Sequence, residues 1–174
     1  DEVFQNAPIF NHNLTVNGGS AKSTYSFGSS LLTQDGIVGG KKSNFRRFTT
    51  RMNYNRDLLE NLKLTANFIY TGTEKKGLPE NGIGSVLFNA LNNAPTFPVR
   101  DSNGEFSLAE GLGNEVVNPV AQTANTFNQT NVSRISGKLG LNYRFWDHFT
   151  AETSLQFNYA EVRGRDFKPT VFYG

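Results

Sequence analysis

Residues 135–159 read ISGKLGLNYRFWDHFTAETSLQFNY, and this stretch decides the fold. Apolar or small side chains take every odd position from 135 to 145, and polar side chains take the positions between them. The same alternation returns over 149–159, after the short connection Trp146-Asp147-His148. A period of two over this length predicts two β-strands, and the short connection predicts a hairpin. One face of this hairpin is apolar with aromatic ends, and the other is polar and partly charged.

Four earlier runs alternate in the same way, at 10–16, 25–31, 48–54 and 62–70. Gly18-Gly19-Ser20 predicts the turn between the first two runs, and residues 57–61 predict the turn between the third and the fourth. We therefore predict an all-β chain of about six antiparallel strands.

The connections divide the chain into three parts. Residues 1–72 are expected to hold four barrel strands in two hairpins, joined by a glycine-rich, basic loop at 34–44. Residues 73–130 form a connection so long that a functional loop is expected. Within it, Ile83, Val86, Leu87, Ala90 and Leu91 follow helical spacing, which predicts a short helix near 83–91. The remainder is expected to be irregular, with turns at 101–104 and at Asn118-Pro119, and residues 131–174 supply the last hairpin and the start of the next loop.

Short and long connections alternate along the chain. In an antiparallel sheet, this order places every tight turn at one end and every long loop at the other. Bacterial outer-membrane barrels have this asymmetry, with short periplasmic turns and long extracellular loops. The sequence therefore predicts a segment of a large transmembrane β-barrel, with extracellular loops at 34–44 and 73–130.

The placement of charge agrees with this prediction. The apolar faces carry no Lys, Arg, Asp or Glu in mid-strand, and His12 is the one ionisable exception. A charge that faces lipid near the middle of a bilayer costs roughly 2 to 4 kcal/mol. Charged residues occupy the opposite faces instead, where a polar lumen accommodates them: Arg47, Arg51, Lys138, Arg144 and Glu152.

Composition excludes several other functions. The net charge of +2 is too small to indicate nucleic-acid binding, and the absence of cysteine excludes disulfides and thiolate metal sites. His12 and His148 are the only histidines, and no Gly-x-Ser-x-Gly motif is present. Residues 101–105 resemble the start of a calcium loop, but the later ligands are missing. We expect no enzyme activity, no catalytic residue, no metal ligand and no cofactor.

Aromatic residues are the remaining candidates for a binding site. Trp146 and its neighbours Phe145 and Phe149 lie at the tight-turn end, where an interfacial aromatic girdle is a better interpretation than a sugar platform. Four phenylalanines of the long connection fit either a carbohydrate platform, a partner contact or packing of the loop on itself: Phe88, Phe97, Phe106 and Phe127. Because these alternatives stay open, no substrate-binding residue is assigned.

Several stretches resemble the SusC/RagA group of TonB-dependent outer-membrane transporters. Residues 16–20 followed by Tyr25 resemble that family's turn between two early barrel strands, and residues 35–38 resemble its next loop. Residues 47–53 resemble the following strand, and residues 118–121 resemble the end of its large loop. The combination in this order is more specific than any one of these motifs.

This resemblance implies a barrel of about 22 strands around an N-terminal plug. It also implies opening by the TonB-ExbB-ExbD system, a SusD-like surface lipoprotein as lid, and import of glycans or peptides. About six strands cannot close around so wide a lumen, so we expect an internal segment of a longer transporter.

Lipopolysaccharide is a further expected partner, because a set of cations maps to the external end of the strands: Lys41, Lys42, Arg46, Lys75, Lys76, Arg163, Arg165 and Lys168. Such cations can form charge-assisted pairs with phosphates. The alternative is that these cations are ordinary loop side chains exposed to solvent and bind no lipid. The alternative function for the whole chain is a soluble or secreted β-barrel, a calyx whose apolar faces point inward and bind a small apolar ligand.

Overall fold

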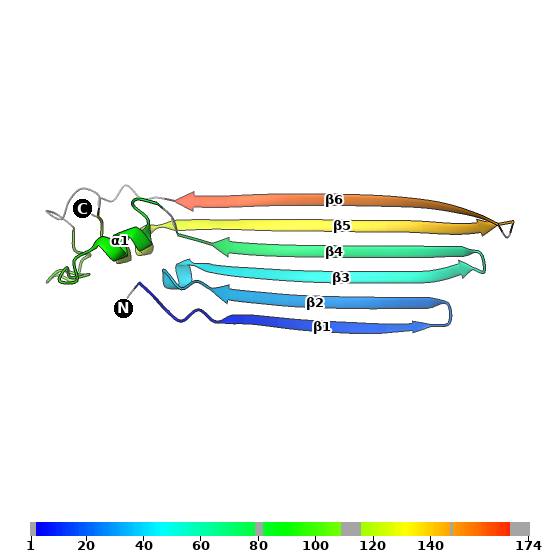
Figure 1. Cartoon of the computed structure of the whole chain (residues 1–174), viewed down its shortest axis with the longest axis horizontal. Coiled ribbons are helices and arrows are strands. Elements are labelled where there is room, and N and C mark those ends of the chain that lie inside the picture. The colour runs from blue at the N-terminus through cyan, green and yellow to red at the C-terminus, as the bar shows by residue number, and fades with distance from the viewer. Residues whose placement is uncertain (1–2, 79–81, 109–115, 147, 168–174) are drawn as a thin grey trace.

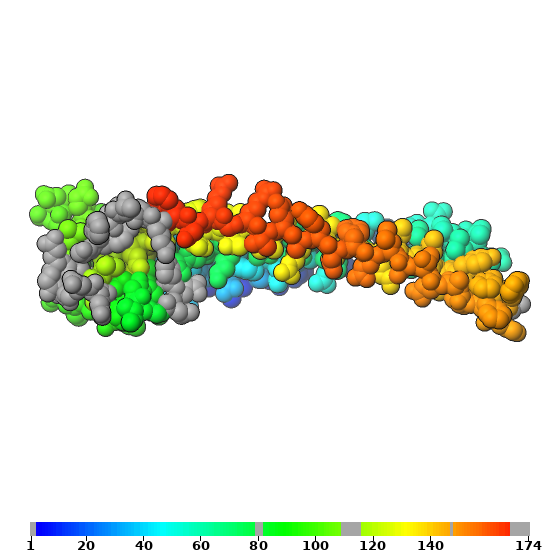
Figure 2. Space-filling model, turned by 90° about the horizontal axis from the view of Figure 1, so that it is seen from above, coloured from blue at the N-terminus to red at the C-terminus, as the bar shows by residue number. Residues whose placement is uncertain are grey.

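The computed structural model describes residues 3–78, 82–108, 116–146 and 148–167. The chain forms a single antiparallel sheet with the strand order β1-β2-β3-β4-β5-β6 (Figure 1). The strands are β1 (Ile9–Ser20), β2 (Ser23–Asp35), β3 (Asn44–Leu59), β4 (Leu62–Lys76), β5 (Phe127–Phe145) and β6 (Phe149–Phe167). Seen edge-on, the sheet is a thin, gently curved layer that thickens only at the loop end (Figure 2). The prediction of six antiparallel strands is confirmed.

The sheet has no hydrophobic core among the described residues. The buried hydrophobic residues are Leu78, Val86 and Ala121, and all three lie outside the strands. Large apolar side chains of the strands stay exposed, as shown by Leu14 at 61% and Leu155 at 70%. Side-chain burial within this layer therefore contributes little, and the backbone ladder holds the strands together.

The register sorts the side chains into two continuous faces. One face, which we call the apolar face, includes Phe27, Met52, Phe68, Gly137 and Phe157, which pair in a single row across β2 to β6. The other, which we call the polar face, includes the neighbouring row Ser26, Asn53, Asn67, Lys138 and Gln156. The alternation expected from the sequence thus runs in phase across all the strands. The two faces need two different surroundings.

The first hairpin turns later than predicted. The ladder between β1 and β2 continues to the pair Ser20 and Ser23, so the turn is Ala21-Lys22 and not Gly18-Gly19-Ser20. The two glycines serve close packing instead, because the ring of Tyr25 occupies the place of a Cβ at Gly18. A Cβ at Gly19 would meet the backbone of the returning strand.

Within the described ranges, the loop end holds three short helices. The 3-10 helix η1 (Gly40–Lys42) lies between β2 and β3, and α1 (Val86–Asn92) and α2 (Pro119–Asn125) lie between β4 and β5. α1 begins three residues after the start of the expected helix, because Gly82 and Gly84 adopt positive φ angles of 95° and 80° before its Ser85 cap. α2 was not expected. Asn118-Pro119, which we interpreted as a turn, forms its N-terminus.

The strands at the loop end are also longer than expected. β4 continues to Lys76 and β5 starts at Phe127, so the connection between them is shorter than residues 73–130. Asp147 and the final residues 168–174, which include Lys168, lie outside the described residues.

Packing of an aromatic ring on a glycine yields a first prediction. The ring of Phe157 lies on the backbone of Gly137, where a Cβ would overlap it, whereas the nearest atoms to a Cβ at Gly140 are 3.9 Å away. Gly137→Ala should therefore displace the half-exposed ring of Phe157 and lower the free energy of unfolding of the full-length barrel by about 0.5 to 1.5 kcal/mol. Gly140→Ala is the matched control and should be neutral or slightly stabilising. Urea unfolding in lipid vesicles measures both, and equal effects would contradict the packing.

Candidate functional site

The apolar face forms a band of about the height of a membrane. In β4 the band runs from Leu62 to Tyr70, and in β5 it runs from Ile135 to Tyr143. These spans match the roughly 9 to 11 residues of a tilted transmembrane strand. No helix in the part of the chain that the structure describes is long and apolar enough to cross a membrane. The face is therefore suited to contact with lipid.

An aromatic cluster marks the tight-turn end of this band. The ring centroid of Phe145 lies 5.9 Å from that of Tyr143, 5.7 Å from that of Phe149 and 5.4 Å from that of Trp146. Trp146 adopts a φ of 49° and is 81% exposed, so it projects from the turn. Tyr25 and Tyr54 pair at the same end of β2 and β3. This arrangement is typical of an interfacial girdle and offers no enclosed sugar site.

The polar face carries a line of cations along its length. Only every second row of paired residues points to the polar face. On this face, five successive rows each contain one cation from β3, β4 or β5. From the loop end, these cations are Lys75, Arg47, Arg134, Arg51 and Lys138. We call these five residues the cation line. None of them makes an ion pair within the described residues, where the ion pairs are Lys63 with Asp57, Lys76 with Glu74 and Arg163 with Glu161.

No carboxylate shares a row with the cation line in the strands that the structure describes. Because strands are spaced by about 4.8 Å, the five cations fall within a strip about 10 Å wide. Their potentials add, and the strip attracts anionic groups that enter the space in front of it. Sequence reasoning identified Arg47, Arg51 and Lys138, and the register adds Lys75 and Arg134.

The loop end owes its shape to buried asparagines. Asn89 of α1 is fully buried and its Nδ2 donates to Gln122 Oε1 of α2 at 2.9 Å, while its Oδ1 accepts from the backbone N–H of Val117 at 3.3 Å. Gln122 Nε2 also donates to the carbonyl of Gly84 at 2.7 Å. These bonds join the two helices. Helical spacing indicated α1, but the sequence gives no signal for which asparagine is buried.

Asn118 has a second structural role in this loop. Its Oδ1 accepts from the N–H groups of Val120 and Ala121 and so caps α2. Its Nδ2 donates to the carbonyls of Val99 at 2.9 Å and Ser107 at 3.2 Å. One side chain thus fixes α2 against a segment 11 to 19 residues earlier in the chain.

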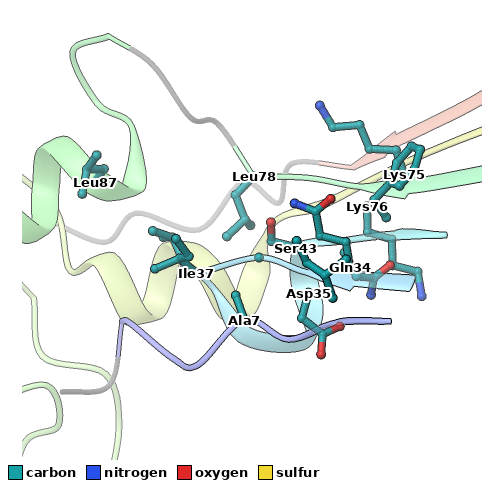
Figure 3. A pocket seen from close by; sticks show the side chains of 14 residues that line it. Ala7, Gln34, Asp35, Ile37, Ser43, Lys75, Lys76, Leu78 and Leu87 are labelled. Atoms are coloured by element: carbon teal, nitrogen blue, oxygen red, sulfur yellow. The ribbon is translucent and has the colours of Figure 1, made fainter. Parts of the chain in front are cut away.

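A cavity of about 720 Å³ opens between this loop and the polar face (Figure 3). On the side of the strands, the cavity is lined by the row of the polar face that lies nearest the loops. This row pairs four residues in sequence across β1 to β4: Ile9, Gln34, Phe45 and Lys75. Ile37, Leu78 and Leu87 line it from the loops, as Figure 3 shows. The cavity is mostly apolar, and Lys75, the first residue of the cation line, stands at its edge. Its volume and apolar lining suit it to receive a ligand.

The structure does not assemble a phenylalanine platform. Ring contacts among the described residues join none of Phe88, Phe97, Phe106 and Phe127 to one another. Phe106 instead lies under the guanidinium of Arg100, 4.4 Å from its ring centroid. The described residues hold no cluster of His, Cys, Asp or Glu that could bind a metal ion.

Comparison with known proteins gives several similar chains, although no family model matches. The chain is 30% identical over 165 residues to TonB-dependent receptor P39 of Formosa agariphila, and the aligned part covers 90% of this chain and 14% of that protein. It is 29% identical over 112 residues to TonB-dependent receptor SusC of Bacteroides thetaiotaomicron, and the aligned part covers 64% of this chain and 11% of that protein. The chain thus spans about an eighth of the length of these relatives.

A solved structure has the same fold. The RagAB peptide importer in its open-open state superposes with a TM-score of 0.77 at 17% sequence identity, over 99% of this chain and 20% of that chain. An open sheet with one lipid-compatible face and one polar face is what a piece of such a barrel requires. The chain is therefore a relative of TonB-dependent receptors, SusC among them, and its six-stranded sheet has the fold of a segment of the RagAB barrel wall.

Proposed function

We propose that this segment forms part of the wall and mouth of an importer of glycans or peptides. One observation carries the proposal: an exposed apolar face and a polar face with a line of unpaired cations lie back to back on the same strands. The apolar face contacts membrane lipid, and the polar face lines the lumen through which substrate passes. RagAB is described as a peptide importer and SusC as a TonB-dependent receptor, and both peptides and glycans are compatible with a polar passage.

The remaining partners follow from the same proposal. The TonB-ExbB-ExbD system acts through a plug region, and the plug occupies the lumen that the polar face borders. Lipopolysaccharide and other outer-membrane lipids surround the apolar face. A SusD-like lipoprotein covers the extracellular mouth, where an apolar stripe on and just before α1 is uncovered: Ile83, three residues before the helix, is 80% exposed, and Leu91 of the helix is 72% exposed.

The orientation of the two faces can be tested with neighbouring residues of β6. Leu155→Arg places a charge on the apolar face, which should lower the stability of the inserted barrel by about 2 to 4 kcal/mol and reduce its amount in the outer membrane. Ser154→Arg places the same charge on the polar face and should be tolerated. Immunoblots of outer-membrane fractions measure the amount. Equal loss for both variants would refute the assignment of faces.

Fractionation of the full-length protein also separates the importer from a soluble calyx. A calyx must turn its apolar side chains inward, but the described strands form an open sheet whose apolar side chains are exposed. The importer should be extracted from membranes only with detergent, whereas a calyx should remain monomeric in buffer without detergent.

Topology is tested by cysteine labelling, since the chain has no native cysteine. We propose that the loops at 36–43 and 77–126 face outward and that the turns near Lys22 and Asn61 face the periplasm. A membrane-impermeant maleimide should label Gly40→Cys on intact cells, while Asn61→Cys should react only after lysis. Labelling of both sites on intact cells, or of Asn61 alone, would contradict this orientation.

The lid contact is tested by changing the stripe on α1. Because Ile83 and Leu91 are exposed, the double substitution Ile83→Asp and Leu91→Asp should leave the loop folded and weaken co-purification of the SusD-like lipoprotein at least ten-fold. Val86 is 1% exposed, so Val86→Asp is the matched control that should unfold the loop and make it sensitive to protease. Normal lid recovery with the double variant would rule out this stripe as the contact.

A further inference from the structure

The apolar face changes character over two rows at the loop end. Tyr70, Ile135 and Tyr159 pair in one row and still belong to the apolar band. Two rows closer to the loops, the paired residues of β2 to β6 are Thr33, Arg46, Glu74, Asn131 and Arg163, while the β1 member of this row is Phe10. The upper edge of the band is therefore a sharp boundary between side chains suited to acyl chains and side chains suited to charged headgroups.

A groove of about 290 Å³ lies on this boundary. Leu31, Phe48 and Tyr70 line its apolar side, and Arg46 and Glu74 line its charged side. The backbone of Gly72 leaves room between them, because a side chain there would start 3.1 Å from the hydroxyl of Tyr70. The rings of Phe48 and Tyr70 are 6.5 Å apart between centroids. Toward the loops, the groove thus changes from apolar to polar, as a membrane changes from acyl chains to headgroups.

Arg46 makes no ion pair among the described residues, although Glu74 is its direct neighbour across β3 and β4. Glu74 is already occupied, since its Oε1 lies 3.7 Å from Lys76 Nζ and its Oε2 accepts from Gln129 Nε2 at 2.9 Å. In the same row, Arg163 is held by Glu161 at 2.6 Å. Arg46 has no ion pair or side-chain hydrogen bond within the described residues, so its guanidinium is free to bind an anion in bidentate fashion.

A second recess, of about 240 Å³, lies beside the first and is strongly basic. Lys41 and Lys42 of η1 line it together with Lys76 of β4, and no carboxylate is among its lining residues. Lys76 is one row further toward the loops than Glu74 on the same face, so the two recesses are adjacent. A ligand that fills both needs acyl chains joined to a headgroup with more than one anionic group.

We propose that this groove and recess form a binding site for lipopolysaccharide, with an acyl chain against Phe48 and Tyr70, a lipid A phosphate on Arg46, and inner-core anionic groups on the three lysines. A glycerophospholipid with a single phosphate, such as phosphatidylethanolamine, does not match both recesses. The site rests on the proposed outward orientation of this end. Of the eight cations that the sequence placed here, four line the two recesses: Lys41, Lys42, Arg46 and Lys76, of which Lys76 also pairs with Glu74. Lys75 belongs to the polar face, and Arg163 is paired with Glu161.

The test measures the lipopolysaccharide that stays bound to the full-length transporter during purification in mild detergent, by mass spectrometry of its hydroxy fatty acids. Arg46→Gln should lower the bound amount about five-fold, the effect expected of one cation at a charged membrane surface. The pair Lys41→Gln and Lys42→Gln should lower it further. Gly72→Val fills the groove without changing charge and should also lower retention.

Matched controls come from the opposite face of the same strands. Arg47→Gln and Lys75→Gln remove the adjacent cations, which belong to the polar face, and should leave retention unchanged. Equal loss in variants and controls, unchanged retention in Arg46→Gln, or replacement of lipopolysaccharide by glycerophospholipid in the wild-type protein would each overturn the site. Labelling at Gly40→Cys on intact cells separates the two levels of failure: labelled cells with unchanged retention reject the site alone, and unlabelled cells reject the proposed orientation.

Discussion

The backbone ladder between neighbouring strands is the interaction on which the rest of this structure depends. Each strand pairs with the next over nearly its whole length, and the described residues bury almost no apolar side chain within the sheet. In a membrane, every backbone N–H and C=O must find a partner inside the protein, and a ladder meets that requirement without a core. Both faces of the sheet are consequently free to suit different surroundings. β1 and β6 each leave one edge open here, which the adjoining strands of a closed barrel would pair.

The register between neighbouring strands determines which side chains lie on the apolar face and which lie on the polar face. A shift of one residue in any strand would move its apolar side chains to the polar face and its cations to the lipid. The cation line exists only because β3, β4 and β5 are paired so that Arg47, Arg51, Arg134 and Lys138 fall in successive rows. The groove at Gly72 depends on the same pairing, since Phe48 and Gly72 are direct neighbours across β3 and β4. Lumenal charge and lipid contact are thus fixed together by one alignment.

Sequence patterns predicted the parts of the fold that a period of two controls. The six strands, their faces and the absence of charge in the apolar band all follow from alternation, which survives without any knowledge of neighbouring strands. Strand ends were underestimated because β4 and β5 continue beyond the apolar band with polar residues on both faces, as at Lys75 and Lys76. The turn at Ala21-Lys22 was missed because glycines that make room for Tyr25 have the same composition as glycines that turn a chain. Arg46 and Lys75 were expected in one set of cations, and the pairing of β3 with β4 places them on opposite faces because both strands continue beyond the apolar band.

The loop end shows a different reason for the limits of sequence. Its interior is built on Asn89 and Asn118, so its shape comes from directed hydrogen bonds more than from apolar burial. A buried amide is favourable only when its donors and acceptors find partners, and four of the partners here lie in other segments, 11 to 33 residues away. Apolar side chains of similar total volume can pack in many arrangements, whereas these hydrogen bonds form in one arrangement of the loop. The mouth of the barrel therefore obtains a defined shape with very little hydrophobic surface, which leaves the apolar stripe of α1 and the cavity beside Lys75 available for contacts outside the loop.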